Sequence, residues 1–168
     1  MTSFRVDVLA EDDWPRLRDI RLKALNTDPT VFLASHENEA TFAEQQWRQE
    51  FARGEWHVMV AIGRLRRGRY VGLVGVTRLP ETSSRECYLE YLWVAPRVRR
   101  RGVASTLLRA VLDRLYRSDV HTVWLYILDG NEPARRLYQR FGFQSTNDVQ
   151  PLPDDPTRSE ELLRLNLD

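Results

Sequence analysis

The sequence predicts an α/β protein in which helices pack on one mixed β-sheet. Apolar and polar residues alternate in several short runs, as they do in strands. Between these runs, apolar residues recur every three or four positions, as they do in helices. The runs follow one another as β-α-α-β-β-β-α-β-α-β, an order typical of a mixed sheet with helices on it. The length of 168 residues favours a single domain that spans residues 1–168.

The N-terminal part of the chain is predicted to contain one strand and two helices. Asp12 or Asp13 can cap the first helix, because a short carboxylate accepts hydrogen bonds from the first amides. Thr41 and Glu44 have the spacing of a capping box and predict the start of the second helix. The expected elements are, in order, a strand at 4–9, a helix that ends at 26–29, an apolar loop element at 31–33, and a helix that Gly54 stops.

The middle of the chain is predicted to form a hairpin, two further strands and a helix. Two β-rich runs flank a tip rich in glycine and arginine, which indicates a hairpin with a solvated tip. Residues 122–128 have apolar side chains on both faces, as a central strand does. The expected elements are strands at 57–62, 70–79, 86–94 and 122–128, a hairpin tip at 63–69, and a helix that ends near Ser118.

The C-terminal part is predicted to contain a short helix and two strands. Asn131 can cap the helix, Pro133 fits its first turn, and Gly142 can end it. Residues 150–157 contain three prolines and two aspartates, which indicates an irregular loop. The strands are expected on either side of that loop, at 143–146 and 161–167.

A basic glycine turn lies between the strand at 88–94 and the helix that follows. Apolar residues recur every four positions in that helix, at Val103, Leu107, Val111 and Leu115. Gly102 allows a ligand to approach the backbone closely, and the first amides of a helix have no partner within the helix. Together with the helix dipole, they favour an anion, most often a phosphate. The alternative is a solvated basic turn that only caps the helix.

The composition argues against several classes of function. The net charge of +1 does not indicate a polycation, and the arginines of residues 97–101 lack interleaved aromatics, so no nucleic-acid partner is expected. No apolar stretch approaches the roughly 18 residues that a membrane span needs. Residues 1–10 do not resemble a secretory signal, so the expected location is the cytoplasm. Cys87 is the only cysteine and is expected to pack as a small apolar residue.

No constellation for metal or covalent catalysis is evident in the sequence. The histidines, the cysteine and the carboxylates do not have the spacing of metal ligands, so no metal is expected. No Ser/His/Asp constellation is apparent either. His57 and His121 belong to no motif.

Two motifs in the second half of the chain belong together. The first is Leu92-Trp93-Val94-Ala95-Pro96 followed by Arg99, Gly102 and Ala104. The second consists of Asn131, Ala134, Tyr138, Gly142 and Phe143. In this order and on these elements, the pair resembles the GNAT superfamily of acyl-CoA-dependent N-acetyltransferases. The predicted order of elements over nearly the whole chain resembles that fold as well.

The resemblance implies a fold, a co-substrate and a class of acceptor. The fold would be a mixed, mostly antiparallel sheet of about six to seven strands flanked by about four helices. Acetyl-CoA would donate the acetyl group to a primary amine of a small molecule or a protein. A second copy of the chain, in a homodimer, is a further candidate partner. The acceptor itself is expected to be selected by the first two helices with residues 26–41 and by residues 150–157.

The resemblance also assigns a donor site. The pantetheine arm would pair with the strand before the glycine turn, as an added strand would, and the pyrophosphate would lie on the amides of the turn. Ala104 stands where many members of the family have a second glycine. The residues implied in donor binding are Leu92, Trp93, Val94, Arg99, Arg100, Arg101, Gly102, Val103, Ala104, Ser105, Asn131 and Tyr138.

Two residues are implied in catalysis. Tyr138 matches the family position of the general acid near the CoA sulfur, and a phenol can protonate a leaving thiolate. Glu90, on the strand before the turn, is the first candidate for the base, and it is expected to share a face with Tyr88 and Leu92. A carboxylate in a cleft can have its pKa raised toward the working pH by burial. Glu86 and a water chain are alternatives for the base.

Each of these residues also has a purely structural interpretation. Asn131 would be a plain helix cap, Tyr138 a buried aromatic residue, and Glu90 the partner of an arginine. The whole chain has a rival interpretation as well, a GNAT-fold module that binds CoA without catalysis and acts as a regulator. A nucleic-acid-binding basic turn is a third, weaker alternative.

Overall fold

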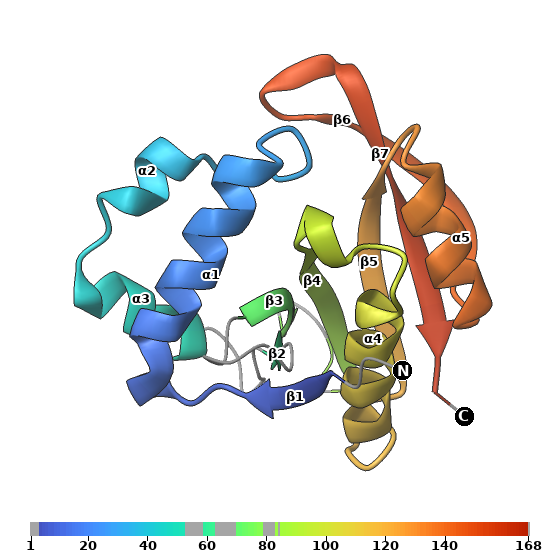
Figure 1. The fold of residues 1–168 in the computed structure, drawn as a ribbon. Coiled ribbons are helices and arrows are strands. Elements are labelled where there is room, and N and C mark those ends of the chain that lie inside the picture. The colour runs from blue at the N-terminus through green and yellow to red at the C-terminus, as the bar shows by residue number, and fades with distance from the viewer. Residues whose placement is uncertain (1–3, 53–58, 63–69, 79–82, 84, 168) are drawn as a thin grey trace.

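The computed structural model describes residues 4–52, 59–62, 70–78, 83 and 85–167, and these form one seven-stranded sheet with helices on it (Figure 1). The strand order is β1-β2-β3-β4-β5-β7-β6. All neighbours are antiparallel except β4 and β5, which are parallel. The strands are β1 Arg5–Val8, β2 Met59–Ile62, β3 Tyr70–Thr77, β4 Glu86–Val94, β5 Thr122–Leu128, β6 Gln144–Leu152 and β7 Asp155–Asn166. The predicted mixed, mostly antiparallel sheet is confirmed.

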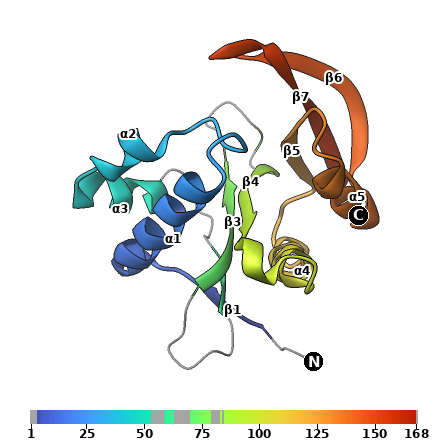
Figure 2. The same ribbon diagram turned by 45° about the horizontal axis from the view of Figure 1, so that its top comes forward.

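The helices lie on both faces of the sheet. Figure 2 shows α1, α2 and α3 on one side of β3 and β4, with α4 on the other side. Figure 1 shows α5 beside β5 and β7. The helices are α1 Trp14–Thr27, α2 His36–Ala40, α3 Glu44–Ala52, α4 Val103–Leu115 and α5 Glu132–Arg140.

The described part of the chain has five α-helices rather than about four, and the additional one is α2. This helix begins after Ser35, whose side chain accepts a hydrogen bond from the backbone amide of Asn38 at 3.1 Å. The predicted capping box at Thr41 is wrong, because the Thr41 hydroxyl donates to the Asn38 carbonyl at the end of α2. Gln46 instead accepts from the Ala43 amide at 2.8 Å at the start of α3. Gly54 lies outside the described residues.

The core lies on both faces of the sheet, under α4 on one side and under α1 and α3 on the other. The four-residue spacing of Val103, Leu107, Val111 and Leu115 predicted the buried face of α4, and all four side chains are buried. The helix packs closely on β3, because a Cβ atom at Gly72 would lie 3.0 Å from both the Leu107 and the Val103 side chains. Cys87 is fully buried in the same cluster, as expected, and burial raises the pKa of its thiol to about 12.

The late hairpin differs from its prediction. Residues 150–157 do not form an irregular loop: β6 continues to Leu152, and β7 begins at Asp155. Pro151 is accommodated opposite Ser159 because β6 is the last strand of the sheet, where a missing backbone N–H is tolerated. The earlier hairpin is confirmed for β2 and β3, whereas its tip at 63–69 lies outside the described residues.

Candidate active site

Strands β4 and β5 are paired at one end only. Their parallel register covers the residue pairs Glu86–Thr122, Cys87–Val123 and Tyr88–Trp124. Beyond them, β4 continues to Val94 and β5 to Leu128 without pairing to each other. The two strands therefore form a fork in which each presents backbone donors and acceptors toward the other. We call the stretch from Leu89 to Val94 the open edge of β4.

A β-bulge interrupts β4 at the fork. Leu73 of β3 lies opposite Trp93, and Gly75 lies opposite Glu90, so β4 has one residue more than β3 in this interval. Tyr91 has a φ of 61°, which is unusual for a side chain of its size. Because Leu73 and Gly75 share a face, Glu90 and Trp93 share one too. The prediction that Glu90 shares a face with Leu92 is therefore wrong, because the bulge shifts the alternation.

The bulge is held by three elements around the ring of Tyr91. On β3, a Cβ atom at Gly75 would lie 2.6 Å from Cδ2 of Tyr91, so the ring occupies the space that a larger residue would fill. On α1, the guanidinium of Arg21 lies 4.3 Å from the ring centroid. On α3, Glu50 accepts a hydrogen bond from the Tyr91 hydroxyl at 3.4 Å. The sequence gives no local signal for these contacts.

The glycine turn has the backbone geometry of an anion site. Gly102 is the N-cap of α4 with a φ of 83°, and Arg100 has a φ of 59°. The first hydrogen bond of the helix runs from Thr106 to the Gly102 carbonyl, so the amides of residues 103–105 precede it. Gly102 has no heavy atom within 4 Å of the position of a Cβ, and Arg100 and Arg101 are exposed. An anion therefore has free access to these amides and to the positive end of the helix dipole.

Arg99 and Trp93 have partners that the sequence analysis missed. Both donate to the carboxylate of Asp28, at the C-terminal end of α1: Trp93 through Nε1 at 2.7 Å, and Arg99 through Nη2. Arg99 also donates from Nε to the Val94 carbonyl at 2.9 Å. These hydrogen bonds therefore connect the end of β4 to the end of α1, and Arg99 forms an ion pair with Asp28. Arg99 and Asp28 are 71 positions apart in the sequence, which explains why no motif revealed this contact.

The segment after α1 is also held by the late hairpin. Arg158 of β7 donates to the backbone carbonyl of Thr30 at 2.8 Å. Figure 1 shows the β6–β7 hairpin extending toward this end of α1. This hydrogen bond joins the predicted acceptor segment 26–41 to β7, one residue beyond the predicted segment 150–157.

Tyr138 lies on α5, and Asn131 lies at the start of the same helix. Tyr138 is buried, and its ring packs edge to face on Phe143 with centroids 5.5 Å apart. Burial raises the pKa of Tyr138, so its phenol stays protonated at neutral pH. The Asn131 side chain accepts a hydrogen bond from the Ala134 amide at 3.3 Å, which makes it the helix cap.

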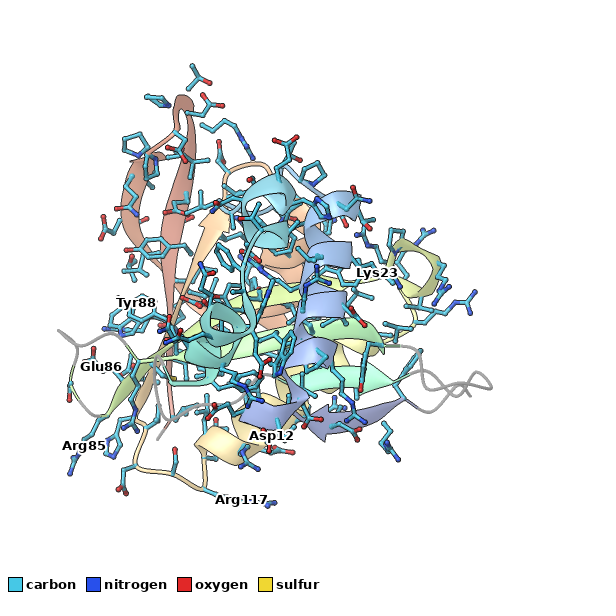
Figure 3. The ribbon with its side chains drawn as sticks, turned by 90° about the vertical axis from the view of Figure 1, so that its left-hand side faces the viewer. Asp12, Lys23, Arg85, Glu86, Tyr88 and Arg117 are labelled. Atoms are coloured by element: carbon cyan, nitrogen blue, oxygen red, sulfur yellow. The ribbon has the colours of Figure 1, made fainter. Side chains whose placement is uncertain are left out.

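The two candidate bases lie at different ends of the fork. Glu86 is at the closed end, where β4 and β5 pair, and it accepts a hydrogen bond from Trp124 Nε1 at 3.2 Å. Figure 3 shows Glu86 close to Tyr88 at the start of β4. Glu90 is half-buried and lies at the open end, next to the bulge. The open end is where a ligand can reach the backbone of both strands, so the geometry favours Glu90 over Glu86.

Within the described ranges, no group of three or more His, Cys, Asp or Glu side chains is arranged to hold a metal ion. No helix of the described chain is long and apolar enough to cross a membrane.

The chain is an α/β protein in which β4 and β5 separate beside the N-terminus of α4, so that an unpaired strand edge lies next to the start of a helix. The family model described as "Acetyltransferase (GNAT) family" matches residues 14–143. This chain belongs to the GNAT acetyltransferase family.

Relatives and solved structures agree with this membership. A mycothiol acetyltransferase from Brachybacterium faecium is 32% identical over 119 residues, which are 70% of this chain and 36% of that protein. This chain thus spans about a third of the length of that relative. The structure of yncA from Salmonella typhimurium with its cofactor acetyl-CoA has a TM-score of 0.75 at 17% identity and covers 99% of this chain and 95% of that one. The Escherichia coli ribosomal-protein-S18-alanine N-acetyltransferase has a TM-score of 0.69 at 18% identity, with 99% and 95% covered.

Proposed function

We propose that this protein transfers the acetyl group of acetyl-CoA to a primary amine of a small molecule or a protein by direct attack. The observation that carries the proposal is the fork between β4 and β5, which opens beside the glycine turn. The fork and the turn offer hydrogen-bonding groups to two parts of the donor, the pantetheine arm and the pyrophosphate. The amides of a pantetheine arm meet the open edge of β4, and a pyrophosphate meets the amides at the start of α4.

The donor-binding roles follow from this placement. The backbone of Leu92, Trp93 and Val94 pairs with the pantetheine arm, while the side chain of Trp93 stays on Asp28. The amides of residues 100–105 bind the pyrophosphate. Arg99 shapes the turn through the Val94 carbonyl, and Asn131 orients the start of α5. Acetyl-CoA supplies the thioester, and the chain holds and orients it.

The chemistry takes two protons from the ammonium nitrogen and gives one to the departing thiolate. The amine arrives mostly as an ammonium ion, because alkyl amines have a pKa of about 10. Glu90 accepts the first proton and later releases it to solvent, and the neutral amine attacks the thioester carbonyl. Tyr138 protonates the thiolate as the C–S bond breaks, and the second proton of the nitrogen then restores the Tyr138 phenol. Tyr138 carries the proton that this step needs, because its phenol is protonated at neutral pH.

Thiol release with a panel of amines tests the proposed function. We expect free thiol to appear from acetyl-CoA only in the presence of a suitable primary amine, in a one-to-one ratio with acetylated product. The panel should include small monoamines, diamines, amino acids and peptides with a free α-amino group. Binding of acetyl-CoA without turnover of any amine would favour a regulatory CoA-binding module. Absence of acetyl-CoA binding would contradict both functions.

Glu90→Gln is expected to lower activity and to move the acidic limb of the pH–rate profile toward the pKa of the amine, about 10. The amide keeps the size of the side chain but cannot accept the proton, so the rate should fall by a factor within the range of about 10²–10⁴ that general base catalysis supplies. Activity should partly recover at high pH, where free amine is more abundant. The measurement is kcat/KM for the amine across pH. Glu86→Gln is the comparison, and a Glu90→Gln enzyme with the wild-type profile would transfer the role to Glu86 or to a water chain.

A further inference from the structure

Tyr91 is the one residue of β4 whose side chain and backbone are both unusual. Its positive φ is sterically costly for an aromatic residue, so the surroundings must hold it in place. Charged groups from three elements surround its side chain: its hydroxyl donates to Glu50 of α3 at 3.4 Å, its ring lies 4.3 Å from the guanidinium of Arg21 on α1, and Glu90 precedes it on β4. Burial and the two carboxylates raise the pKa of Tyr91, so its phenol is always neutral and has one proton to donate.

We propose that Tyr91 is a positioning residue for Glu90, with its hydroxyl shared between the carboxylates of Glu90 and Glu50. This inference rests on the proposed function, in which Glu90 accepts the proton of the amine. The shared hydrogen bond fixes the direction of the Glu90 carboxylate and keeps two like charges apart without neutralising either. The side chain of Tyr91 acts through Glu90, and the proposal assigns this side chain no contact with either substrate.

A buried ion pair between Arg21 and Glu39 packs against one face of the Tyr91 ring. Arg21 donates to Glu39 of α2 through Nε at 3.0 Å and through Nη2 at 2.9 Å, and both side chains are nearly inaccessible. The guanidinium lies over two rings, 4.3 Å from the centroid of Tyr91 and 5.0 Å from that of Phe32. A two-pronged contact of this kind leaves little freedom of rotation. The ring is therefore confined between a fixed cation on α1 and Gly75 on β3.

The arrangement explains why the bulge carries a tyrosine rather than glycine. Glycine would adopt a positive φ at lower cost, but it would supply neither the hydroxyl nor the surface on which Arg21 rests. Contacts with α1 and α3 offset the backbone strain. The three helices on this face are thereby connected to the candidate base through a single side chain.

Two substitutions with opposite effects test the proposal. Tyr91→Phe keeps the ring and removes the hydrogen bond to Glu90, so the acidic limb of the pH–rate profile should move to higher pH by about one unit, since a carboxylate that loses a donor holds its proton more tightly. Its kcat should fall by about tenfold, less than the roughly 10²–10⁴-fold expected from loss of the base itself. Glu50→Gln removes a neighbouring negative charge, so the acidic limb should move to lower pH. Tyr116→Phe, at an exposed position at the end of α4, is the matched control and should change nothing.

The KM for acetyl-CoA and the melting temperature separate positioning from loss of structure. Both should stay near their wild-type values in Tyr91→Phe. In a Glu90→Gln background, Tyr91→Phe should have little further effect, because it acts through Glu90. A wild-type pH profile in Tyr91→Phe, or additive losses in the double variant, would overturn the inference while leaving the proposed function intact. A Glu90→Gln enzyme with the wild-type profile would instead refute the base assignment and the inference together.

Discussion

Gly102→Asp is expected to abolish most of the affinity for acetyl-CoA while leaving the protein folded. Gly102 is the N-cap of α4, and a side chain there meets no heavy atom within 4 Å. A carboxylate at this position sits beside the amides that would hold the pyrophosphate, where it both repels the phosphates and competes for the same donors. Calorimetric titration of acetyl-CoA in the absence of an acceptor measures the effect.

Gly102→Asn is the matched control. Asn and Asp have nearly the same size and both tolerate a positive φ, so the two variants share the backbone cost and differ in charge. We expect the aspartate variant to bind acetyl-CoA at least about tenfold more weakly than the asparagine variant, a difference of roughly 1.4 kcal/mol. Equal affinities of the two variants would show that the pyrophosphate does not lie at this turn.

Tyr138→Phe is expected to lower kcat by at least about tenfold, because general acids typically supply about 10²–10⁴-fold. The ring remains and continues to pack on Phe143, but the proton for the thiolate is lost. Because burial raises the pKa of Tyr138, the wild-type residue stays protonated at neutral pH and should cause no alkaline loss of activity there. The test is single-turnover thiol release with the preferred amine, together with the affinity for acetyl-CoA, which should not change.

The outcome for Tyr138→Phe distinguishes two sources of the proton. An unchanged rate would show that water or another group protonates the thiolate, and that Tyr138 is a packing residue of α5. A loss of rate together with a loss of acetyl-CoA affinity would indicate that the hydroxyl contributes to binding. Only a fall in kcat at constant affinity supports the proposed role.

Elements with strong local signals were predictable from the sequence. The bounds predicted for β4 and β5 agree with the structure, because both strands are rich in apolar and aromatic residues and end at clear breaks. The cap at Asn131 and the buried face of α4 were also predicted correctly, since both depend on residues only three or four positions apart in the sequence. The long late strands were not, because Pro151 is compatible with a strand only at an edge, and the position of an edge is a property of the whole sheet.

The candidate site was predictable in its motifs but not in its side-chain geometry. The residues adjacent to Tyr91 in the sequence do not predict its positive φ, because the bulge depends on contacts with Gly75 and Arg21, which lie on other elements. Because of that single extra residue, Leu92 lies on the face opposite to Glu90, and Trp93 lies on the same face as Glu90. The partner of Arg99 was hidden for the same reason, since Asp28 is close only after folding.

The short pairing of β4 with β5 has a consequence for the stability of the whole chain. The sheet consists of two parts, β1 to β4 and β5 with β7 and β6, and only three residue pairs join their strands. A ligand in the fork would bridge these parts, so binding and resistance to unfolding become thermodynamically linked. At a ligand concentration of a hundred times Kd, this linkage adds about 2.7 kcal/mol. The donor would then act as a missing strand, and the fully occupied protein would unfold as a more cooperative unit than the empty one.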